Sequence, residues 1–256
     1  MIVRDLCVGY GKKMVIEGLN TSVSAGEVVA LVGPNGCGKT TLLRTLAGIY
    51  APTSGTIIIN EKKLSDIDPS ELGRIVGYVP QQFFYIPYTT VMETVLIGRT
   101  PYMSQKPTDE DLQIVNDVME RMNILDLAER NVNELSGGQR QRVFIARAFS
   151  QTPNFLVFDE PTNTLDLRHQ LSTMRLMREA AHKEGKGVIV ALHDLSLALR
   201  YSDRTVMMTD GKIYGDGPTE TTITERSVSD VYGVDVKITE DGEGRHIHLV
   251  DRSGTF

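Results

Sequence analysis

The most constraining feature of the sequence is an apolar run, Val28–Val32, that leads directly into a glycine-rich loop at residues 33–40. The three glycines of the loop let consecutive backbone amides approach and wrap a polyphosphate. Lys39 adds a mobile positive charge, and a helix-compatible segment, residues 40–49, follows at once. The N-terminus of that helix adds a partial positive charge, and Thr40 is placed to give a hydroxyl ligand to Mg²⁺. This order of strand, loop and helix predicts a nucleotide phosphate site in an α/β fold.

The loop also contains one of the two cysteines of the chain. Cys37 lies near Lys39 and near the start of the helix, and both lower the pKa of a thiol, so a reactive thiolate is one expectation. A small, inert residue in a tight loop is the alternative. The residues expected to contact the nucleotide in this region are Gly33, Pro34, Asn35, Gly36, Cys37, Gly38, Lys39, Thr40 and Thr41.

The alternation of a β-rich run with a helix-compatible segment recurs in the second half of the chain. Residues 155–158 precede a helical segment at 166–184, and residues 188–192 precede another at 195–201. Such alternation predicts a mainly parallel sheet with crossover helices. Ligands bind these sheets at the carboxyl ends of the strands, so the reactive groups are expected along one edge.

Between Gln82 and Gln151 the β-rich rhythm stops. Thr108 is placed to cap a helix from residue 109 to about 122, and Ser136 to open a helix that reaches about residue 150. These helices predict an inserted helical lobe. The expected organisation is one domain, 1–256, with a nucleotide-binding core at 1–81 and 151–220, a helical subdomain at 82–150 and a C-terminal extension at 221–256.

Composition sets further limits on the chain. With 256 residues, 41% of them apolar, it can bury the core of one large domain. A net charge of -6 gives no basic surface for nucleic acid, so no nucleic-acid partner is expected. No apolar run approaches the roughly 20 residues that span a bilayer. The N-terminus lacks a secretory signal pattern, and the low cysteine content fits a reducing cytoplasm.

A second feature of the phosphate site is the pair of acids that follows the apolar run 155–158. Asp159 suits a carboxylate that holds Mg²⁺, directly or through water. Glu160 is the next residue, can point differently, and suits a general base that polarises the attacking water. Many strands end in solvated acids, so this pattern gains its meaning from the glycine-rich loop that precedes it.

The sequence Leu135-Ser136-Gly137-Gly138-Gln139 adds an anion site of a different kind. Ser136 and Gln139 have the spacing of a capping box, and the two glycines leave amides accessible at a helix N-terminus. An ordinary capped helix explains the serine and the glutamine but not both glycines. Followed by Arg140-Gln141-Arg142, the motif resembles the signature of ATP-binding cassette (ABC) ATPases.

Other segments extend this resemblance over nearly the whole chain. Pro161, Thr162 and Asp166 match the family's D-loop region, and the family fold has an antiparallel β subdomain at its N-terminus and an α-helical subdomain inserted in a P-loop NTPase core. The resemblance implies that Tyr10 stacks on adenine. It also implies that Gln81 is the Q-loop residue that reaches Mg²⁺ and the lytic water, with Gln82 as the other register.

The resemblance further implies the roles of the remaining site residues. His193 resembles the switch histidine that contacts the γ-phosphate, and Asp166 connects the two sites of a pair. The implied catalytic residues are Glu160, His193 and Gln81; the implied metal ligands are Thr40, Gln81 and Asp159; and the implied nucleotide contacts outside the loop are Tyr10, Ser136, Gly137, Gly138, Gln139 and Asp166. The implied cofactors are ATP and Mg²⁺.

In this family two chains face head to tail, and each ATP lies between the loop of one chain and the signature of the other. A homodimer of ATPase subunits is therefore implied. Hydrolysis then separates the two chains.

Several segments resemble the ATPases of importers for iron-siderophores, haem, cobalamin and related metal chelates. They lie at residues 90–93, 98–102, 165–170, 192–198 and 231–234. This resemblance implies integral-membrane permease partners, an indirect link to a substrate-binding protein, and a peripheral location on the cytoplasmic face of the cell membrane. It places Phe83, Phe84 and Tyr85 near the permease, although packing inside the helical lobe is equally expected.

Two other readings remain open at this point. A soluble ABC ATPase of an assembly or scaffold complex would use the same dimer without a permease, and co-purification with a soluble complex would favour it. A nucleotide-binding regulatory module would switch without useful turnover. The presence of both Glu160 and His193 disfavours that reading.

Overall fold

Across the described residues, which are 1–11, 13–81, 89–163, 165–242 and 244–250, the computed structural model has a six-stranded sheet at its centre. Its strands, in spatial order, are β10 (Lys212–Pro218), β9 (Arg204–Thr209), β3 (Val28–Val32), β8 (Gly187–Ala191), β7 (Phe155–Asp159) and β6 (Val76–Val79). β10 is antiparallel to β9, and the other neighbours are parallel. The predicted mainly parallel α/β core is confirmed.

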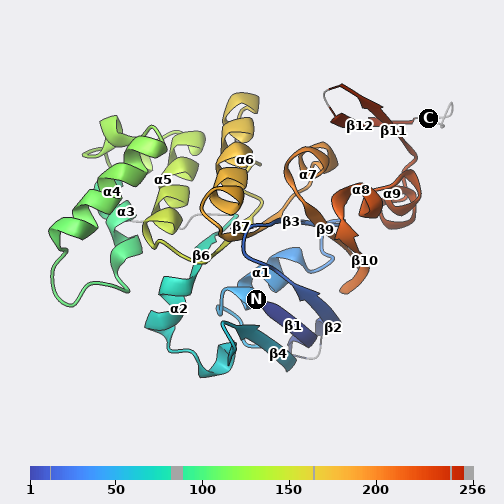
Figure 1. Ribbon diagram of the computed structural model, residues 1–256, viewed down its shortest axis with the longest axis horizontal. Coiled ribbons are helices and arrows are strands. Elements are labelled where there is room, and N and C mark those ends of the chain that lie inside the picture. Colours follow the sequence, from blue (N-terminus) through green and yellow to red (C-terminus); the bar gives the residue numbers. More distant parts are fainter. Residues whose placement is uncertain (12, 82–88, 164, 243, 251–256) are drawn as a thin grey trace.

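The central strands are apolar on both faces, as expected for a parallel sheet that is covered on both sides. Alternate residues of β3 enter different cores: Val29 and Leu31 pack into one, and Val28, Ala30 and Val32 into the other. One face carries α1 (Lys39–Leu46) and α2 (Pro69–Ile75), and the other carries α6 (Leu167–His182) and α7 (Leu195–Tyr201). Figure 1 shows this layering, with α6 and α7 above the sheet and α1 below it.

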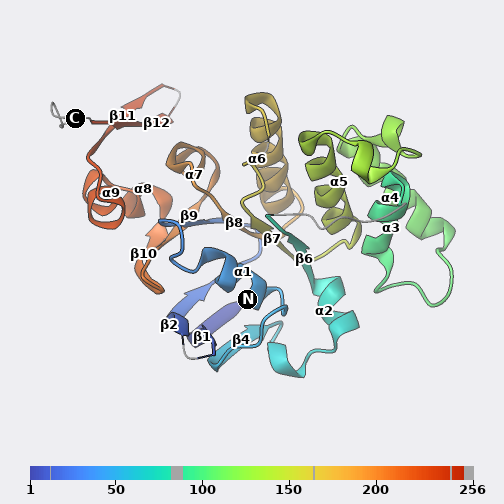
Figure 2. The same ribbon diagram turned by 180° about the vertical axis from the view of Figure 1, so that it is seen from behind.

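A second, antiparallel sheet lies beyond α1. Its spatial order is β2 (Lys13–Ser22), β1 (Ile2–Tyr10), β4 (Ser54–Ile59) and β5 (Lys62–Lys63). Figure 2 shows α1 between this sheet and the six-stranded one. The short turn η1 (Leu64–Asp66) joins β5 to α2. The antiparallel N-terminal sheet that the resemblance implied is present.

The helical lobe contains α3 (Val91–Leu96), α4 (Asp109–Arg121) and α5 (Gly137–Ser150), with short turns η2 (Ile97–Arg99), η3 (Leu125–Leu127) and η4 (Val132–Glu134). Each of its three α-helices begins at a capping box, at Thr90, Thr108 and Ser136. Such a cap satisfies otherwise unpaired amides and is worth about 1 kcal/mol. The predicted helix starts at Thr108 and Ser136 are confirmed. Within the described residues, no helix of the chain has the length and apolar character needed to cross a membrane.

The C-terminal segment begins after a tight turn. Asp210 and Gly211 have φ values of 47° and 75°, and two positive φ values suit the turn that joins β9 to β10. The chain continues through α8 (Thr219–Thr222) and α9 (Glu225–Tyr232) into an antiparallel hairpin of β11 (Val236–Asp241) and β12 (Gly244–Leu249). The hairpin packs on α7 through β12.

Candidate active site

The carboxyl ends of four neighbouring parallel strands bring the predicted site together. The glycine-rich loop follows β3, Asp159 ends β7, His193 follows β8 and Gln81 follows β6. Because these strands run in the same direction, their ends meet at one edge of the sheet. Residues that are up to 160 positions apart therefore share one site, as the strand pattern predicted.

The glycine-rich loop is fixed by close backbone packing. A side chain on Gly33 would place its Cβ 2.2 Å from the backbone oxygen of Met208, and Gly38 has a φ of 108° at the start of α1. Lys39 is only 5% exposed, and its ammonium Nζ donates to the carbonyls of Gly33 at 2.7 Å and Pro34 at 3.1 Å. These bonds hold the ammonium group of Lys39 against the backbone of the loop.

The loop borders a small cavity of about 140 Å³. Its lining comprises Val15, Asn35, Gly36, Gly38, Lys39, Thr40, Thr41 and Glu160. The cavity thus joins the phosphate-binding amides to the acid expected to act as the base. It is the kind of amide-lined, positively charged depression that accepts a terminal phosphate.

The expectation of a reactive Cys37 is wrong. The side chain is buried, and burial raises the pKa of its thiol, although the nearby Lys39 charge opposes this shift. Desolvation disfavours the thiolate more than the loop charge favours it. The alternative, a small residue filling a tight loop, fits this environment.

Asp159 provides the carboxylate expected for a metal ion. Its side chain is fully buried and accepts hydrogen bonds from Thr40 Oγ1 at 2.9 Å and from the Tyr78 hydroxyl at 3.2 Å. Burial raises the pKa of Asp159, and both hydrogen bonds oppose this. A carboxylate and a hydroxyl in contact are hard oxygen ligands of the kind that Mg²⁺ prefers, so the residues fit the ion.

Glu160 lies at the centre of the predicted catalytic group. Its backbone has a φ of 51°, which turns the side chain away from the neighbouring Asp159, and it is 8% exposed. Oε1 lies 2.5 Å from Nε2 of His193. Oε2 accepts from the side-chain amide of Gln81 and, at 2.6 Å, from that of Asn163. The structure therefore brings all three predicted catalytic residues into direct contact.

Two contacts in this group were missed from the sequence. Asn163 was assigned no role from the sequence, yet its side-chain amide binds Glu160. Tyr78 was not singled out, yet its hydroxyl bridges Asp159 and the guanidinium of Arg44. Burial raises the pKa of Tyr78 to about 12, so the phenol stays protonated and can donate. The position of Tyr78 three residues before Gln81 was the available signal.

The signature residues lie at the start of α5, in the helical lobe. Ser136 Oγ accepts from the amide of Gln139 at 3.3 Å, and the Gln139 side chain accepts from the amide of Ser136 at 3.0 Å. A Cβ on Gly137 would meet open space, so its face of the helix is accessible. Among the described residues, the lining of the loop cavity includes none of the four predicted signature contacts. The glycine-rich loop and the signature of the same chain therefore do not line one common cavity.

Tyr10 and Asp166, two of the predicted nucleotide contacts, are both exposed. The Tyr10 ring is 49% exposed and meets the Tyr50 ring edge-on at 5.5 Å, with its hydroxyl 3.5 Å from Thr41 Oγ1. Asp166 caps α6. Its carboxylate accepts a hydrogen bond from the backbone amide of His169, and this bond lowers the pKa of the carboxyl. Leu167 beside it is 78% exposed.

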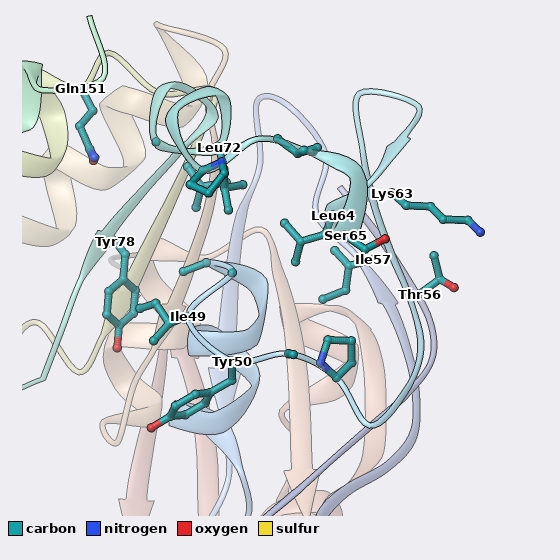
Figure 3. Close-up of a pocket in the computed structure, with 18 of the residues that line it drawn as sticks. Ile49, Tyr50, Thr56, Ile57, Lys63, Leu64, Ser65, Leu72, Tyr78 and Gln151 are labelled. Carbon is teal, nitrogen blue, oxygen red and sulfur yellow. The ribbon is translucent and has the colours of Figure 1, made fainter. Parts of the chain in front are cut away.

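A larger groove lies next to this site, between the core and the helical lobe. Its volume is about 740 Å³, and Figure 3 shows it between the segment after α1, the region of η1 and α2, and Gln151 at the end of α5. Apolar residues dominate its lining: Ile49, Ile57, Leu64, Ile67, Leu72 and Ile97. Tyr78 also lines it and contacts Asp159, so the groove reaches the predicted metal carboxylate through one side chain.

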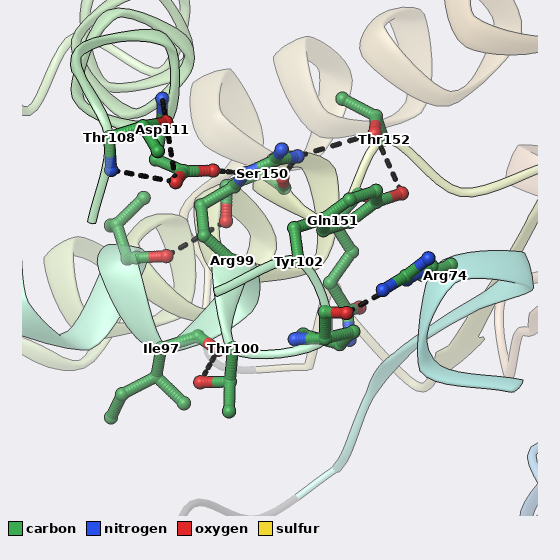
Figure 4. Close-up of polar contacts among 12 residues, drawn as sticks. Arg74, Ile97, Arg99, Thr100, Tyr102, Thr108, Asp111, Ser150, Gln151 and Thr152 are labelled. Atoms are coloured by element: carbon green, nitrogen blue, oxygen red, sulfur yellow. Dashed lines mark hydrogen bonds and ion pairs between the residues drawn. The ribbon is translucent and has the colours of Figure 1, made fainter. Parts of the chain in front are cut away.

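Residues 98–102 form a wedge in the wall of this groove. A Cβ on Gly98 would lie 2.1 Å from Ser150 Oγ, so only glycine lets the wedge approach α5 this closely. Arg99 pairs with Asp111 at 2.8 Å, with both side chains 5% exposed, and donates to the Ser150 carbonyl at 2.9 Å. Figure 4 shows these bonds. They fix the wedge to both α4 and α5.

The other end of the wedge contacts the core. The guanidinium carbons of Arg99 and Arg74 lie 3.9 Å and 5.0 Å from the centre of the Tyr102 ring. Arg74 Nε, from α2, donates to the Pro101 carbonyl at 2.8 Å (Figure 4). Residues 98–102 were noted in the sequence only for their resemblance to importer ATPases. Their structural role is to join the two lobes at the groove.

Phe83, Phe84 and Tyr85, expected near this surface, lie outside the described residues.

Comparison with known proteins agrees with this site. The family model described as ABC transporter matches residues 16–163. An uncharacterized ABC transporter ATP-binding protein of Methanocaldococcus jannaschii is 42% identical over 90% of this chain and 89% of its own length. The petrobactin import ATP-binding protein FpuD of Bacillus anthracis is 35% identical over 93% of this chain and 88% of its own length. The hemin import ATP-binding protein HmuV of Thermobifida fusca is 37% identical over 92% of this chain and 82% of its own length.

Solved structures show the same relationship. A metal-chelate type ABC transporter in an inward-facing conformation has a chain that matches with a TM-score of 0.83 and 28% identity, over 97% of this chain and 96% of that one. A dimeric ATP-binding cassette in a post-hydrolysis state, bound to ADP and phosphate, matches with a TM-score of 0.77 and 28% identity, over 85% and 98%.

Proposed function

This chain belongs to the ABC transporter family as an ATP-binding, ATP-hydrolysing subunit, and from that premise we propose that it energises the import of a metal chelate. The chelate class is an iron-siderophore, haem, cobalamin or a related compound. Relatives named for petrobactin and hemin import, and the likeness to a metal-chelate type transporter, support this class. The arrangement around Glu160 is the observation that carries the catalytic part of the proposal.

In the proposed reaction, the glycine-rich loop and Lys39 bind the phosphates of ATP. Thr40 and Asp159 hold Mg²⁺, which neutralises charge on the phosphates when bound. Glu160 orients the attacking water and accepts its proton. Gln81 and His193, both in contact with Glu160, position that carboxylate and the terminal phosphate.

The proposed active unit is a head-to-tail pair of chains. The signature amides at the start of α5 lie apart from the chain's own loop cavity and face open space at Gly137. An anion site of this kind suits the terminal phosphate of an ATP held by a second copy. Asp166, at the exposed start of α6 next to Leu167, is proposed to link the two sites.

The proposed partner at the groove is a cytoplasmic helix of the permease. The groove of about 740 Å³ has a mainly apolar lining, and an amphipathic helix binds such a groove by its apolar face. We further propose a peripheral location on the cytoplasmic face of the membrane and an indirect link to a substrate-binding protein. The division into a core at 1–81 and 151–220, a helical subdomain at 82–150 and an extension at 221–256 is part of the same proposal.

The experiment that tests this proposal is purification of the chain with its permease, followed by reconstitution into vesicles. The loaded substrate-binding protein is then added with candidate metal chelates. One chelate is expected to stimulate ATP hydrolysis and to enter the vesicles only with ATP. Isolation of the chain in a soluble assembly without a permease would overturn the import proposal.

A further inference from the structure

Arg147 is a cation of the groove, and no carboxylate among the described residues pairs with it. It lies on α5 and lines the cavity, and its guanidinium carbon is 4.9 Å from the centre of the Phe144 ring. In the described part of the chain, Arg147 forms no ion pair, and the cavity lining contains Lys63 and Arg147 but no carboxylate.

Two other stacked arginines of the helical lobe each pair with a carboxylate. Arg121 also stacks on a phenylalanine ring, that of Phe149, at 5.1 Å, and it pairs with Glu184 at 2.6 Å. Arg99 stacks on Tyr102 and pairs with Asp111. Both of these stacked guanidinium groups have a carboxylate from the same chain. Arg147 shares the stacking but lacks the acid.

The physical situation of Arg147 favours a partner from outside the chain. Arginine keeps its proton in proteins, so the group remains charged, although burial lowers its pKa. A partly desolvated charge is unfavourable until a carboxylate or another acceptor pairs with it. The groove adjoining Arg147 is where such a group can approach.

We propose that Arg147 recognises a carboxylate on the permease helix that docks in the groove. This inference rests on the proposed function and specifies the chemistry of its partner: a cytoplasmic helix with apolar side chains on one face and an Asp or Glu at the position that meets α5. The apolar wall at Ile49 and Leu72 takes the apolar side chains, and Arg147 takes the acid. The net positive lining of the groove, in a chain of net charge -6, selects an acidic helix over a basic one.

The contact would also set the register of the docked helix. Gly98 of the wedge packs against the backbone oxygen of Arg147, which a Cβ would approach to 2.3 Å. The backbone of Arg147 is therefore held between the wedge and the rest of α5. A carboxylate that binds Arg147 is bound to the same helix that begins with the signature.

The test uses the complex of the full chain with its permease. Arg147→Met keeps much of the side-chain volume but removes the charge, and Arg147→Glu reverses it. Loss of one partner of a desolvated charge pair should weaken permease binding about 30-fold or more. Arg147→Lys should retain most of the binding because it keeps the charge. Arg178→Glu on the exposed surface of α6, where Arg178 forms no ion pair among the described residues, is the control and should bind normally.

Three further measurements separate recognition from folding. Arg147→Met should leave basal ATP hydrolysis of the isolated chain unchanged and should keep or raise its melting temperature, because it removes a partly desolvated charge that pairs with no carboxylate among the described residues. In the Arg147→Glu complex, replacing each acid of the permease's cytoplasmic loops by arginine in turn should restore assembly at one position. Normal assembly of Arg147→Glu and Arg147→Met would overturn the inference. A wild-type chain that binds no permease would instead overturn the proposed function.

Discussion

Nε2 of His193 lies 2.5 Å from Oε1 of Glu160, although the two residues follow different strands of the central sheet. The other oxygen of Glu160 is bound by Gln81 and Asn163. The carboxylate is therefore held on both sides by residues from three separate loops. Such support fixes the direction of a general base more firmly than a single hydrogen bond does.

Replacing Glu160 by glutamine tests this assignment. The variant keeps the size and the contacts of the side chain but cannot accept a proton. We expect ATP binding to persist and hydrolysis to slow by about 10²–10⁴-fold. ATP should then hold two chains together as a stable dimer, which gel filtration with ATP detects. Near-normal turnover would show that another group is the base.

The thiol of Cys37 offers a test of the loop geometry. In a Cys7→Ser variant, Cys37 is the remaining thiol of the chain. Because burial raises its pKa, little thiolate is present at neutral pH, and alkylation should be slow there and accelerate as the pH rises. Bound Mg-ATP should slow it further. Equal alkylation rates with and without nucleotide would contradict a loop that wraps the phosphates.

The wedge predicts a stability effect that is separate from catalysis. Arg99→Met leaves the carboxylate of Asp111 buried without its cation, and we expect a loss of about 3 kcal/mol. Chemical denaturation measures the loss. The control is the exposed pair of Lys62 and Glu71, where Lys62→Met should cost less than about 1 kcal/mol.

The same pair has a defined pH dependence. The amide of Thr108, and then Arg99, lower the pKa of Asp111. The stabilisation is therefore complete above the ordinary aspartate pKa of about 3.9 and is lost as the pH falls through the lowered value in the folded chain. Arg99→Met should flatten this acid dependence. An unchanged acid dependence would contradict the role of the pair.

Two glycines of the helical lobe should respond oppositely to substitution. Gly137→Asp places its side chain in open space and adds a negative charge at a helix N-terminus, so folding stability should be kept or slightly increased. The same charge should repel the phosphate of a facing ATP and abolish ATP-dependent dimerisation. Gly98→Ala should destabilise the fold, because its Cβ meets Ser150 Oγ at 2.1 Å. Thermal melting and gel filtration distinguish these outcomes.

The local features of the site could be predicted because each has a short-range physical cause. The phosphate loop is set by glycines between an apolar strand and a helix, and the capping box of Ser136 and Gln139 is fixed by their spacing. The parallel order of β3, β8 and β7 then follows from the alternation of strands and helices. These features together place Lys39, Asp159 and His193 along one edge.

Contacts that depend on the folded backbone, between residues near or far in the sequence, could not be predicted in the same way. The amide of Asn163 reaches Glu160 because of the local turn at Glu160, whose positive φ is not encoded by its residue type. The close approach of Gly33 to the backbone of Met208 joins two segments that are far apart in the sequence. The groove exists only because the wedge holds α2 beside α5 through Arg74 and Tyr102. Each of these features depends on the packed fold.

The central claim is that each ATP site is assembled from two chains. It is tested most directly in the proposed permease complex, which would hold two cassettes together, by mixing a Lys39→Ala chain with a Gly137→Asp chain. Each variant alone should be inactive. In the mixed complex, the intact loop of the Gly137→Asp chain faces the intact signature of the Lys39→Ala chain, so ATP hydrolysis should reappear. Hydrolysis no higher than that of either variant alone would contradict the claim.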